Sequence, residues 1–506
     1  MERPRVGLGL KKMASRLKCQ IQPPGCISSG CFPRFARVIK DFLGILMQID
    51  ASIFKAYDIR GIVDKTLTED AVCAVGRVLG TMALEKGVKT FCVARDGRLT
   101  GPRLLAALKK GVASTGIDVV DIGAVPTPAL YFAAAHFGCG TGVAVTGSHN
   151  PPEYNGLKMM VGGVTLCAED IQNVRRRAEA QAWMVAEEPG KITEVDIIPD
   201  YVAAATKDIR IEHPMTMAID AGNGIAGPVM LKMLEAVGVK AAPLFCEPDG
   251  RFPNHHPDPS KPKNLQDLIE CVKHGDAQIG LALDGDGDRL GVVTKKGEII
   301  FPDRLMMLFA EDILTHQPGA EIVYDVKCSR KLVDWIAAKG GVPVISCTGH
   351  SLVKARLRET NAPFAGEMSG HLFFNDERWF GFDDGLYAGM RLLEIVSRAS
   401  DPSAVLENLP NAVNTPELQI PTAEGENKRF IERFQTQCRF PDAEHVITID
   451  GVRVEWADGF ALARASNTTP VVVLRFEGDT EEALSRIERV FMAEMRRVDP
   501  ALALPQ

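Results

Sequence analysis

The stretch GVAVTGSHNPP at residues 142–152 joins an apolar run to a stiff polar loop. Residues 142–145 predict a buried strand, and Gly147 permits a tight turn. The Asn-Pro-Pro that follows prevents a regular helix or a paired strand. Ser148 on this loop is therefore a candidate for covalent chemistry, although a Ser and a His can equally satisfy the backbone of a turn.

Junctions of this kind recur and indicate the fold class. Apolar strands followed by Gly-rich polar loops alternate with helices, which is typical of α/β proteins whose ligands bind at the carboxyl edge of an open sheet. After about residue 409 the pattern changes to closely spaced strands and a final helix at 480–497, which predicts a smaller α+β domain. Strands of the first type are predicted at residues 90–94, 118–122, 214–219, 278–283, 321–326 and 342–346.

The length of 506 residues is too great for one core and predicts three or four domains. We expect three similar mixed α/β domains and a smaller C-terminal α+β domain around a central cleft. A net charge of −7 gives no sign of nucleic-acid or membrane binding, and no apolar run is long enough to span a bilayer. Twelve scattered cysteines indicate reduced thiols in a cytoplasm. We expect a cytoplasmic monomer with a basic extension at 1–46 and domains at 47–195, 196–298, 299–408 and 409–506.

The first 46 residues differ from the remainder in charge. They hold nine Lys and Arg side chains against two acidic ones, a local balance of +7, so the rest of the chain carries −14. The segment lacks a long periodic pattern, and its apolar part is short for a signal core. We interpret it as a disordered, non-catalytic extension, with a transit-like peptide as the alternative.

The sequence DGDGDR at residues 284–289 is the strongest single motif. Three carboxylates at alternate positions repel one another unless a cation neutralises them, and all-oxygen ligands favour Mg²⁺. An EF-hand is rejected because the twelfth position is Lys295 instead of a glutamate. The alternative is a solvated acidic turn.

Two further loops have the composition of phosphate- or sugar-binding sites. RASNTTP at 464–470 places a guanidinium beside hydroxyl and amide donors, which suits phosphate oxygens. GEMSGH at 366–371 alternates Glu367, Ser369 and His371, an arrangement suited to sugar hydroxyls. Each loop, taken alone, can equally be a capped turn.

These motifs, in this order, resemble those of the α-D-phosphohexomutases, most closely the bacterial phosphomannomutase/phosphoglucomutase enzymes. TGSHNP at 146–151, KAYDIRG at 55–61 and NGLK at 155–158 match as well, and the resemblance runs from about residue 49 to the end. Gly147 stands where many relatives have Ala, and the basic extension has no counterpart in the family pattern.

The resemblance implies a phosphohexomutase that interconverts hexose 1- and 6-phosphates of mannose, glucose or both. Ser148 would carry the phosphoryl group, a hexose 1,6-bisphosphate would be intermediate and activator, and one Mg²⁺ would be held by Ser148, Asp284, Asp286 and Asp288. Arg289 and Lys158 would stabilise charge, and the base is one of His371, His350, Lys158 or Arg60. Substrate binding would fall to Tyr57, Lys327, Thr348, Gly349, Glu367, Ser369, Arg464, Ser466, Asn467 and Thr468.

Three alternative functions stay open at this point. One is phosphoglucosamine mutase, whose phosphate loop usually reads RPSGTEP. The others are a metal-dependent phosphatase and a non-catalytic phosphosugar-binding protein. We also expect the last domain to close as a lid, with a hinge near residues 409–416.

Overall fold

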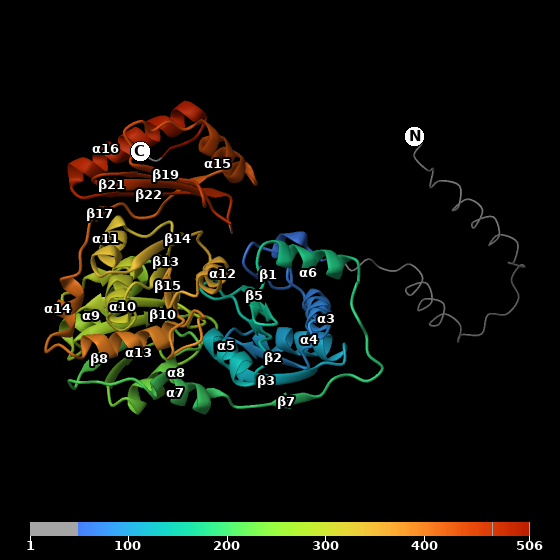
Figure 1. Cartoon of the computed structure of the whole chain (residues 1–506). Coiled ribbons are helices and arrows are strands. Elements are labelled where there is room, and N and C mark those ends of the chain that lie inside the picture. Colours follow the sequence, from blue (N-terminus) through green and yellow to red (C-terminus); the bar gives the residue numbers. More distant parts are fainter. Residues whose placement is uncertain (1–48, 468, 505–506) are drawn as a thin grey trace, which may run out of the picture. The chain divides into compact units, whose positions relative to one another are not determined.

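The structure is a computed structural model that describes residues 49–467 and 469–504. The expected extension at 1–46 and the site residue Thr468 lie outside these residues. Three α/β/α domains are followed by a C-terminal domain with an antiparallel sheet (Figure 1), which confirms the predicted fold class. No helix in the described part of the chain combines the length and apolar character needed to cross a membrane.

The first sheet has seven strands in the order β1-β5-β4-β2-β3-β7, with β6 paired to β5. Helix α3 begins at Glu69, because the Thr68 hydroxyl accepts a hydrogen bond from the Ala71 N–H and caps the helix. It packs closely on α4, since a Cβ at Gly111 would lie 2.2 Å from the Cys73 carbonyl oxygen. The strands are β1 (Ile59–Ile62), β2 (Thr90–Arg95), β3 (Asp118–Ala124), β4 (Gly142–Val145), β5 (Tyr154–Val161), β6 (Val164–Thr165) and β7 (Ile192–Glu194). The helical elements are η1 (Ala51–Ile53), α3 (Glu69–Glu85), α4 (Gly101–Ala113), α5 (Thr127–His136) and α6 (Glu169–Glu179).

The second sheet has the order β12-β11-β10-β8-β9. Strands β10 and β11 form an antiparallel pair, and the loop between them carries the predicted metal-binding aspartates. The strands are β8 (Thr216–Asp220), β9 (Lys240–Leu244), β10 (Ile279–Leu283), β11 (Leu290–Thr294) and β12 (Ile299–Ile300). The helical elements are α7 (Ile198–Thr206), α8 (Gly227–Ala236), η2 (Pro262–Leu265) and α9 (Gln266–His274).

The third sheet has the order β14-β13-β15-β16, and the β15–β16 turn carries the predicted sugar-binding loop. The strands are β13 (Glu321–Asp325), β14 (Val342–Ser346), β15 (Phe364–Gly366) and β16 (Leu372–Phe374). The helices are α10 (Pro302–His316), α11 (Arg330–Ala338), α12 (His350–Thr360), α13 (Gly385–Val396) and α14 (Pro402–Glu407).

The fourth sheet is antiparallel, with the order β17-β22-β21-β20-β19 and β18 paired to β22. Two helices cover one of its faces (Figure 1), and their aromatic residues share a core with the sheet. The strands are β17 (Val413–Asn414), β18 (Leu418–Pro421), β19 (His445–Ile447), β20 (Val452–Trp456), β21 (Gly459–Ala465) and β22 (Val471–Gly478). The helices are α15 (Glu426–Gln437) and α16 (Glu481–Val498).

Backbone hydrogen bonds join loops from different sheets. The Thr127 N–H donates to the Asp286 carbonyl at 2.9 Å, and the Leu290 N–H donates to the Gly370 carbonyl at 3.1 Å. The buried Arg453 donates to the Val326 and Cys328 carbonyls, each at 2.7 Å. Hydrogen bonds therefore link the first domain to the second, the second to the third, and the third to the fourth.

Candidate active site

Ser148 lies three residues beyond the fully buried strand β4. Its φ of 49° lies in the left-handed region, which is uncommon for a residue other than glycine. Its side chain is almost fully buried, and its N–H donates to the Thr146 hydroxyl at 2.8 Å. Its Oγ donates to Asp284 Oδ2 at 3.0 Å, so the predicted nucleophile contacts the predicted metal loop directly.

Arg98 holds the Ser148 loop and was not identified as functional from the sequence. The guanidinium is buried and donates to the carbonyls of Ser148 and Asn150 at 2.8 and 2.6 Å. It also donates to the carbonyls of Pro151 and Tyr154 at 2.6 and 3.0 Å. The available signal was the polar run 95–98 directly after strand β2, at the same sheet edge as Ser148.

Gly147 makes room for this arginine. A Cβ at residue 147 would lie 2.4 Å from the Arg98 Cζ atom, so an alanine there requires the guanidinium to shift. Asp96 completes the support, because its carboxylate pairs with Arg98 at 3.2 Å and accepts from the Thr146 hydroxyl at 2.8 Å. The Ser148 loop is therefore held in place by the contacts of Arg98 and Asp96 as well as by its prolines.

The three aspartates of the β10–β11 loop are fully buried and converge. One oxygen of each of Asp284, Asp286 and Asp288 lies within 4.8 Å of the others. Asp284 Oδ1 accepts from the backbone N–H groups of Gly287, Asp288 and Arg289 at 3.0, 3.0 and 3.2 Å. These three bonds fix the loop in a turn.

The charge in this loop is incompletely balanced by protein groups. Lys158 Nζ contacts Asp288 Oδ2 and lies 2.7 Å from Asp286 Oδ2. Although burial lowers the pKa of Lys158, attraction to Asp286 and Asp288 raises it above its ordinary value. Burial, together with repulsion from Asp288 and Asp286, raises the pKa of Asp284 well above its ordinary range.

The remaining oxygens of the loop fit a cation. Asp286 Oδ1 and Asp288 Oδ1 are buried and have no hydrogen-bond partner. Unpaired buried carboxylate oxygens are costly unless a cation meets them. An all-oxygen set of this kind suits a hard divalent ion, so the buried triad could hold a metal.

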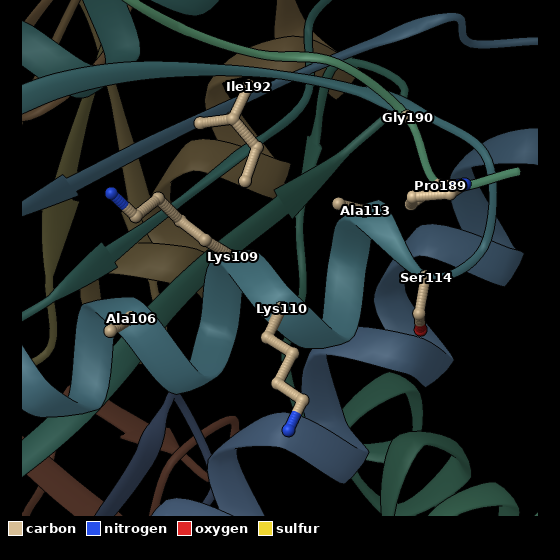
Figure 2. A pocket seen from close by; sticks show the side chains of 8 residues that line it. All are labelled: Ala106, Lys109, Lys110, Ala113, Ser114, Pro189, Gly190 and Ile192. Atoms are coloured by element: carbon tan, nitrogen blue, oxygen red, sulfur yellow. The ribbon is translucent and has the colours of Figure 1, made fainter.

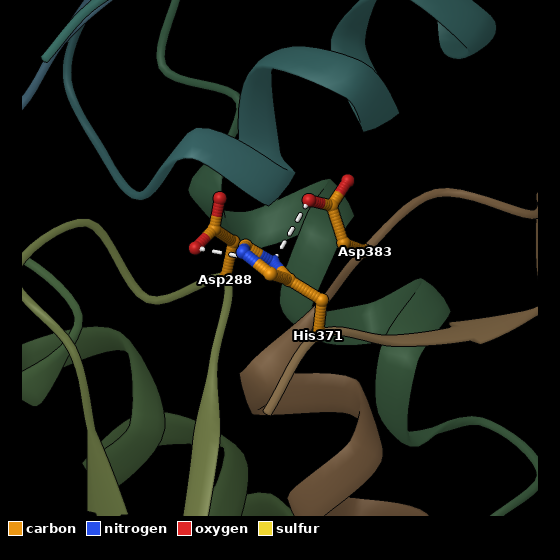
Figure 3. Close-up of side chains that lie close together, drawn as sticks. All are labelled: Asp288, His371 and Asp383. Atoms are coloured by element: carbon orange, nitrogen blue, oxygen red, sulfur yellow. Dashed lines mark ion pairs between the residues drawn. The ribbon is translucent and has the colours of Figure 1, made fainter. Parts of the chain in front are cut away.

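A second buried group connects this loop to the third domain (Figure 3). His371 Nδ1 lies 3.1 Å from Asp383 Oδ2 and 3.6 Å from Asp288 Oδ1, and the Arg289 Nε–H donates to His371 Nε2 at 3.0 Å. His350 Nδ1 lies 3.6 Å from the same Asp383 oxygen. Both histidines were predicted as candidate bases, whereas Asp383, one of two adjacent aspartates between Phe382 and Gly385 and outside the motifs, was not predicted.

Lys354 balances the charge of Asp383, because its Nζ lies 2.8 Å from Asp383 Oδ1. Although burial raises the pKa of Asp383, attraction to Lys354 lowers it well below the ordinary range. Burial lowers the pKa of His350 well below its ordinary value. The two histidines therefore share one carboxylate, whose charged form Lys354 stabilises.

The predicted sugar-binding residues lie on the β15–β16 turn. The Ser369 hydroxyl donates to Glu367 Oε2 at 2.8 Å, and the Gly349 N–H lies 3.2 Å from Glu367 Oε1. Asp325, which the sequence analysis missed, accepts from the Thr348 hydroxyl at 2.9 Å and positions this neighbouring loop. His371, in contrast, is turned toward the metal loop.

The predicted phosphate-binding loop lies between β21 and β22. Arg464 Nε is buried and lies 3.0 Å from Asp450 Oδ2. The Asn467 amide donates to the Tyr57 hydroxyl, which donates to the Thr348 carbonyl at 2.7 Å. Ser466 Oγ lies 3.0 Å from the Thr469 hydroxyl.

Two of the predicted site residues with positively charged side chains form ion pairs with acidic residues. Arg60 contacts Asp58 and the side chain of Asn150, which belongs to the Ser148 loop. Lys327 Nζ lies 3.5 Å from Glu417 Oε2, beside strand β18. Both side chains therefore have carboxylate partners in the free protein.

A surface hollow lies apart from these residues. It has a volume of about 440 Å³ and contains none of the predicted site residues. Figure 2 shows that helix α4 contributes Lys109 and Lys110 to its walls, while the segment before β7 contributes Pro189 and Gly190. The predicted site residues that lie close together are on the strand-end loops, away from the residues that line this hollow.

Comparison with family models gives matches along most of the chain. The models of phosphoglucomutase/phosphomannomutase α/β/α domains I, II and III match residues 51–184, 199–297 and 301–413, respectively. The phosphoglucomutase/phosphomannomutase C-terminal domain matches residues 411–494.

Individual relatives give the same result. A phosphoglucomutase of Neisseria gonorrhoeae is 53% identical over 449 residues, covering 88% of this chain and 97% of that protein. A phosphomannomutase/phosphoglucomutase of Pseudomonas aeruginosa is 50% identical over 458 residues, covering 90% and 98%. The crystal structure of a phosphoglucomutase/phosphomannomutase family protein of Burkholderia thailandensis superposes with a TM-score of 0.86 at 51% identity, covering 91% of this chain and 100% of that one. The chain therefore belongs to the phosphoglucomutase/phosphomannomutase family of α-D-phosphohexomutases and is an isomerase of that kind.

Proposed function

We propose that this enzyme interconverts the 1- and 6-phosphates of glucose and mannose through a phosphorylated Ser148. The observation that carries the proposal is the 3.0 Å contact between Ser148 Oγ and Asp284, within a buried aspartate triad. The names of the Neisseria and Pseudomonas relatives support both sugars as substrates.

The chemistry consists of two phosphoryl transfers in opposite directions. In the first, the bond between phosphorus and Ser148 Oγ breaks while a bond to the free sugar hydroxyl forms, giving a hexose 1,6-bisphosphate. After the bisphosphate turns over in the cleft, its other phosphate returns to Ser148. Such transfers depend mainly on in-line placement and charge neutralisation.

The metal is proposed to be Mg²⁺, held by Ser148, Asp284, Asp286 and Asp288. When bound, it supplies Lewis-acid stabilisation of phosphoryl oxygens. Lys158 contacts two aspartates of this loop, and Arg289, the last residue of the same loop, acts electrostatically on Asp284. Both cations would stabilise the negative charge that develops on the transferring group. Arg98 keeps Ser148 in its left-handed conformation by binding the carbonyls of its loop.

Substrate recognition is divided between two loops. Glu367 and Ser369 bind sugar hydroxyls, while Arg464, Ser466, Asn467 and Thr468 bind the phosphate that is not transferred. Glucose and mannose differ only at C2, and we expect Glu367 and Ser369 to bind hydroxyls that both sugars share. Tyr57, Lys327, Thr348 and Gly349 complete the cleft.

The proposed domains have separate tasks. Residues 47–195 carry the phosphoserine loop, 196–298 the metal loop, 299–408 the sugar-binding loop and 409–506 the phosphate-binding lid. Enclosure by the lid keeps the bisphosphate from escaping during its turnover.

Among the candidate bases, the contacts favour His371. Lys158 is engaged by two carboxylates and Arg60 by Asp58 and Asn150. His371 is also engaged, at Nδ1 by Asp383 and at Nε2 by Arg289. It differs in that Nε2 can take a proton once the Arg289 bond is released, while Asp383 orients the ring and stabilises the charge that it would then carry. We expect His371→Gln to lower kcat more than His350→Gln does, and equal losses would contradict this ranking.

Intact-protein mass spectrometry tests the phosphoserine. After incubation with glucose 1,6-bisphosphate, the wild type should gain one phosphate and Ser148→Ala should gain none. We expect Ser148→Ala to lose mutase activity by on the order of 10³-fold or more, because no other group accepts the phosphoryl group. A phosphate increment that persists in Ser148→Ala would refute the assignment.

A further inference from the structure

A pair of thiols lies in the first domain, outside the proposed active site. Cys92 is on strand β2 and is fully buried, while Cys139 is half-buried in the turn between α5 and β4. Their sulfur atoms are 3.6 Å apart although 47 positions separate them in sequence. The two thiols therefore meet only because of the fold.

The two cysteines differ in access. Cys139 is half-buried and lines a surface hollow of about 280 Å³ together with Phe137, Gly138 and Lys89, so it is the more accessible residue of the pair. A hydrogen bond from the Cys92 thiol is the main cause that lowers the pKa of Cys139, to about 7. Because the thiolate is the reactive form, Cys139 is the thiol that an oxidant would attack first.

The backbone around Cys139 allows the sulfurs to approach. A disulfide requires a separation of about 2.05 Å, so the sulfurs must move together by about 1.5 Å. Cys92 is fixed between β3 and β4, opposite Val120 and Gly142. Cys139 is flanked by Gly138 and Gly140, whose φ values of 64° and 54° show a turn that glycine can readjust.

We propose that Cys92 and Cys139 form a reversible oxidation site for small hydroperoxides, in which two thiols become one intrachain disulfide. The Cys139 thiolate attacks one peroxide oxygen, the O–O bond breaks, and after proton uptake a sulfenic acid and water are formed. The Cys92 sulfur then attacks the sulfenic sulfur, the S–O bond breaks and a second water leaves. In total, two thiols are oxidised and one hydrogen peroxide is reduced to two waters.

Peptide mapping of the full-length protein tests the linkage. The reduced protein is treated with hydrogen peroxide in graded amounts, alkylated and digested with trypsin without a reductant. We expect the peptide 90–95, which contains Cys92, to appear joined to the peptide 111–158, which contains Cys139. Dithiothreitol should restore both alkylation sites together.

Variants separate the roles of the two sulfurs. In Cys92→Ser, Cys139 should stop at a sulfenic acid that dimedone traps, because no thiol can resolve it. In Cys139→Ser, Cys92 should stay reduced. The matched control is Cys271→Ser, since Cys271 is also half-buried and burial raises its pKa; this variant should form the linkage as the wild type does.

Two results would overturn the proposal. One is a wild-type protein in which both thiols stay alkylatable after peroxide treatment. The other is oxidation of Cys139 to sulfinic acid without any peptide linked to Cys92. A supporting kinetic result is native alkylation of Cys139 on the order of tenfold faster than that of Cys271.

Discussion

The Ser148 loop and the proposed phosphate-binding loop at 464–470 both follow buried strands but differ in their surroundings. Ser148 and its three aspartates are at most 1% exposed, and Arg98 donates four hydrogen bonds to backbone carbonyls of the loop. Ser466 and Asn467 are half-exposed, and Thr469 is exposed. The Asn467 amide of the second loop contacts the Tyr57 hydroxyl of the first domain.

This difference matches the two tasks in the proposed reaction. Transfer of a phosphoryl group requires atoms held in fixed positions, which a buried and densely bonded loop provides. Binding either phosphate of a reorienting sugar requires a loop that can close after the substrate has entered. Changes in the first loop should therefore reduce kcat, and changes in the second should mainly raise KM.

The largest effect is expected from the metal loop. Asp288→Asn removes one negative charge from the triad and weakens metal binding. The value of kcat/KM should therefore fall by a factor that corresponds to several kcal/mol of lost transition-state stabilisation. Mg²⁺ at about a hundred times its Kd should stabilise the folded wild type by about 2.7 kcal/mol, seen as a higher thermal midpoint.

The same variant separates metal binding from catalysis. Asp288→Asn should lose most of the Mg²⁺-dependent rise in thermal midpoint, while Asp276→Asn, at an exposed position of the same domain, should keep it. An equal rise in Asp288→Asn and the wild type would show that the ion binds elsewhere.

Arg464→Ala tests the second loop. The guanidinium is buried beside Asp450 and is proposed to bind the distal phosphate through a charge-assisted contact. Its loss should cost about 1.5–3 kcal/mol in kcat/KM, mainly through KM. Arg429→Ala, at an exposed position of helix α15, is the control. An Arg464→Ala variant that loses kcat alone would contradict the proposed division.

Much of this site could be predicted because its motifs are contiguous. Ser148, the Asp284–Asp288 run and the Glu367 loop each follow an apolar strand, and the structure places these loops together. Arg98, Asp325 and Asp383 were missed because each acts through residues distant in sequence, so no local pattern distinguishes them from surface polar residues. Arg98 is the clearest case, since its four acceptors lie 50 or more residues away.

The main strands of the fold were predictable because each is a contiguous run of mostly apolar residues. Strands β2, β4 and β10 are apolar throughout or nearly so, and the structure places them within their sheets. Short or half-exposed elements such as β6, β7 and β17 were not predicted, because pairing with a neighbouring strand defines them more than their own residues do.

The stability of the folded protein is expected to depend on pH through the buried carboxyl group of Asp384. Asp384 caps helix α13 through the Tyr387 N–H, and the Tyr201 hydroxyl donates to it. Burial raises its pKa to about 7, from 3.8. The folded state therefore keeps a proton that the unfolded state releases, and stability falls as pH rises between about 4 and 7, by up to about 1.4 kcal/mol per pH unit.

Asp384→Asn removes this ionisation. The thermal midpoint of the variant minus that of the wild type should increase as the pH is raised from about 5 to about 7. Asp401→Asn, at the exposed cap of α14, should show no such trend. A constant difference for Asp384→Asn would exclude the linkage.

The smallest effect is expected at the contact between the two regions. The Asn467 amide donates to the Tyr57 hydroxyl, so the phosphate-binding loop already contacts the first domain without substrate. Asn467→Ala should raise KM for hexose phosphates by about two- to tenfold, the equivalent of about 0.5–1.5 kcal/mol for one hydrogen bond, and leave kcat nearly unchanged.

A double-mutant cycle with Tyr57→Phe decides what this contact does. If Asn467 serves closure through Tyr57, the two changes should be less than additive in kcat/KM, because either one removes the same bond. If Asn467 acts only on the phosphate, the effects should add. Additive effects would mean that the contact between Asn467 and Tyr57 contributes nothing to closure and that the substrate alone holds the proposed lid. The loop at 464–470 would then be less constrained by the protein, relative to the Ser148 loop, than this contact indicates.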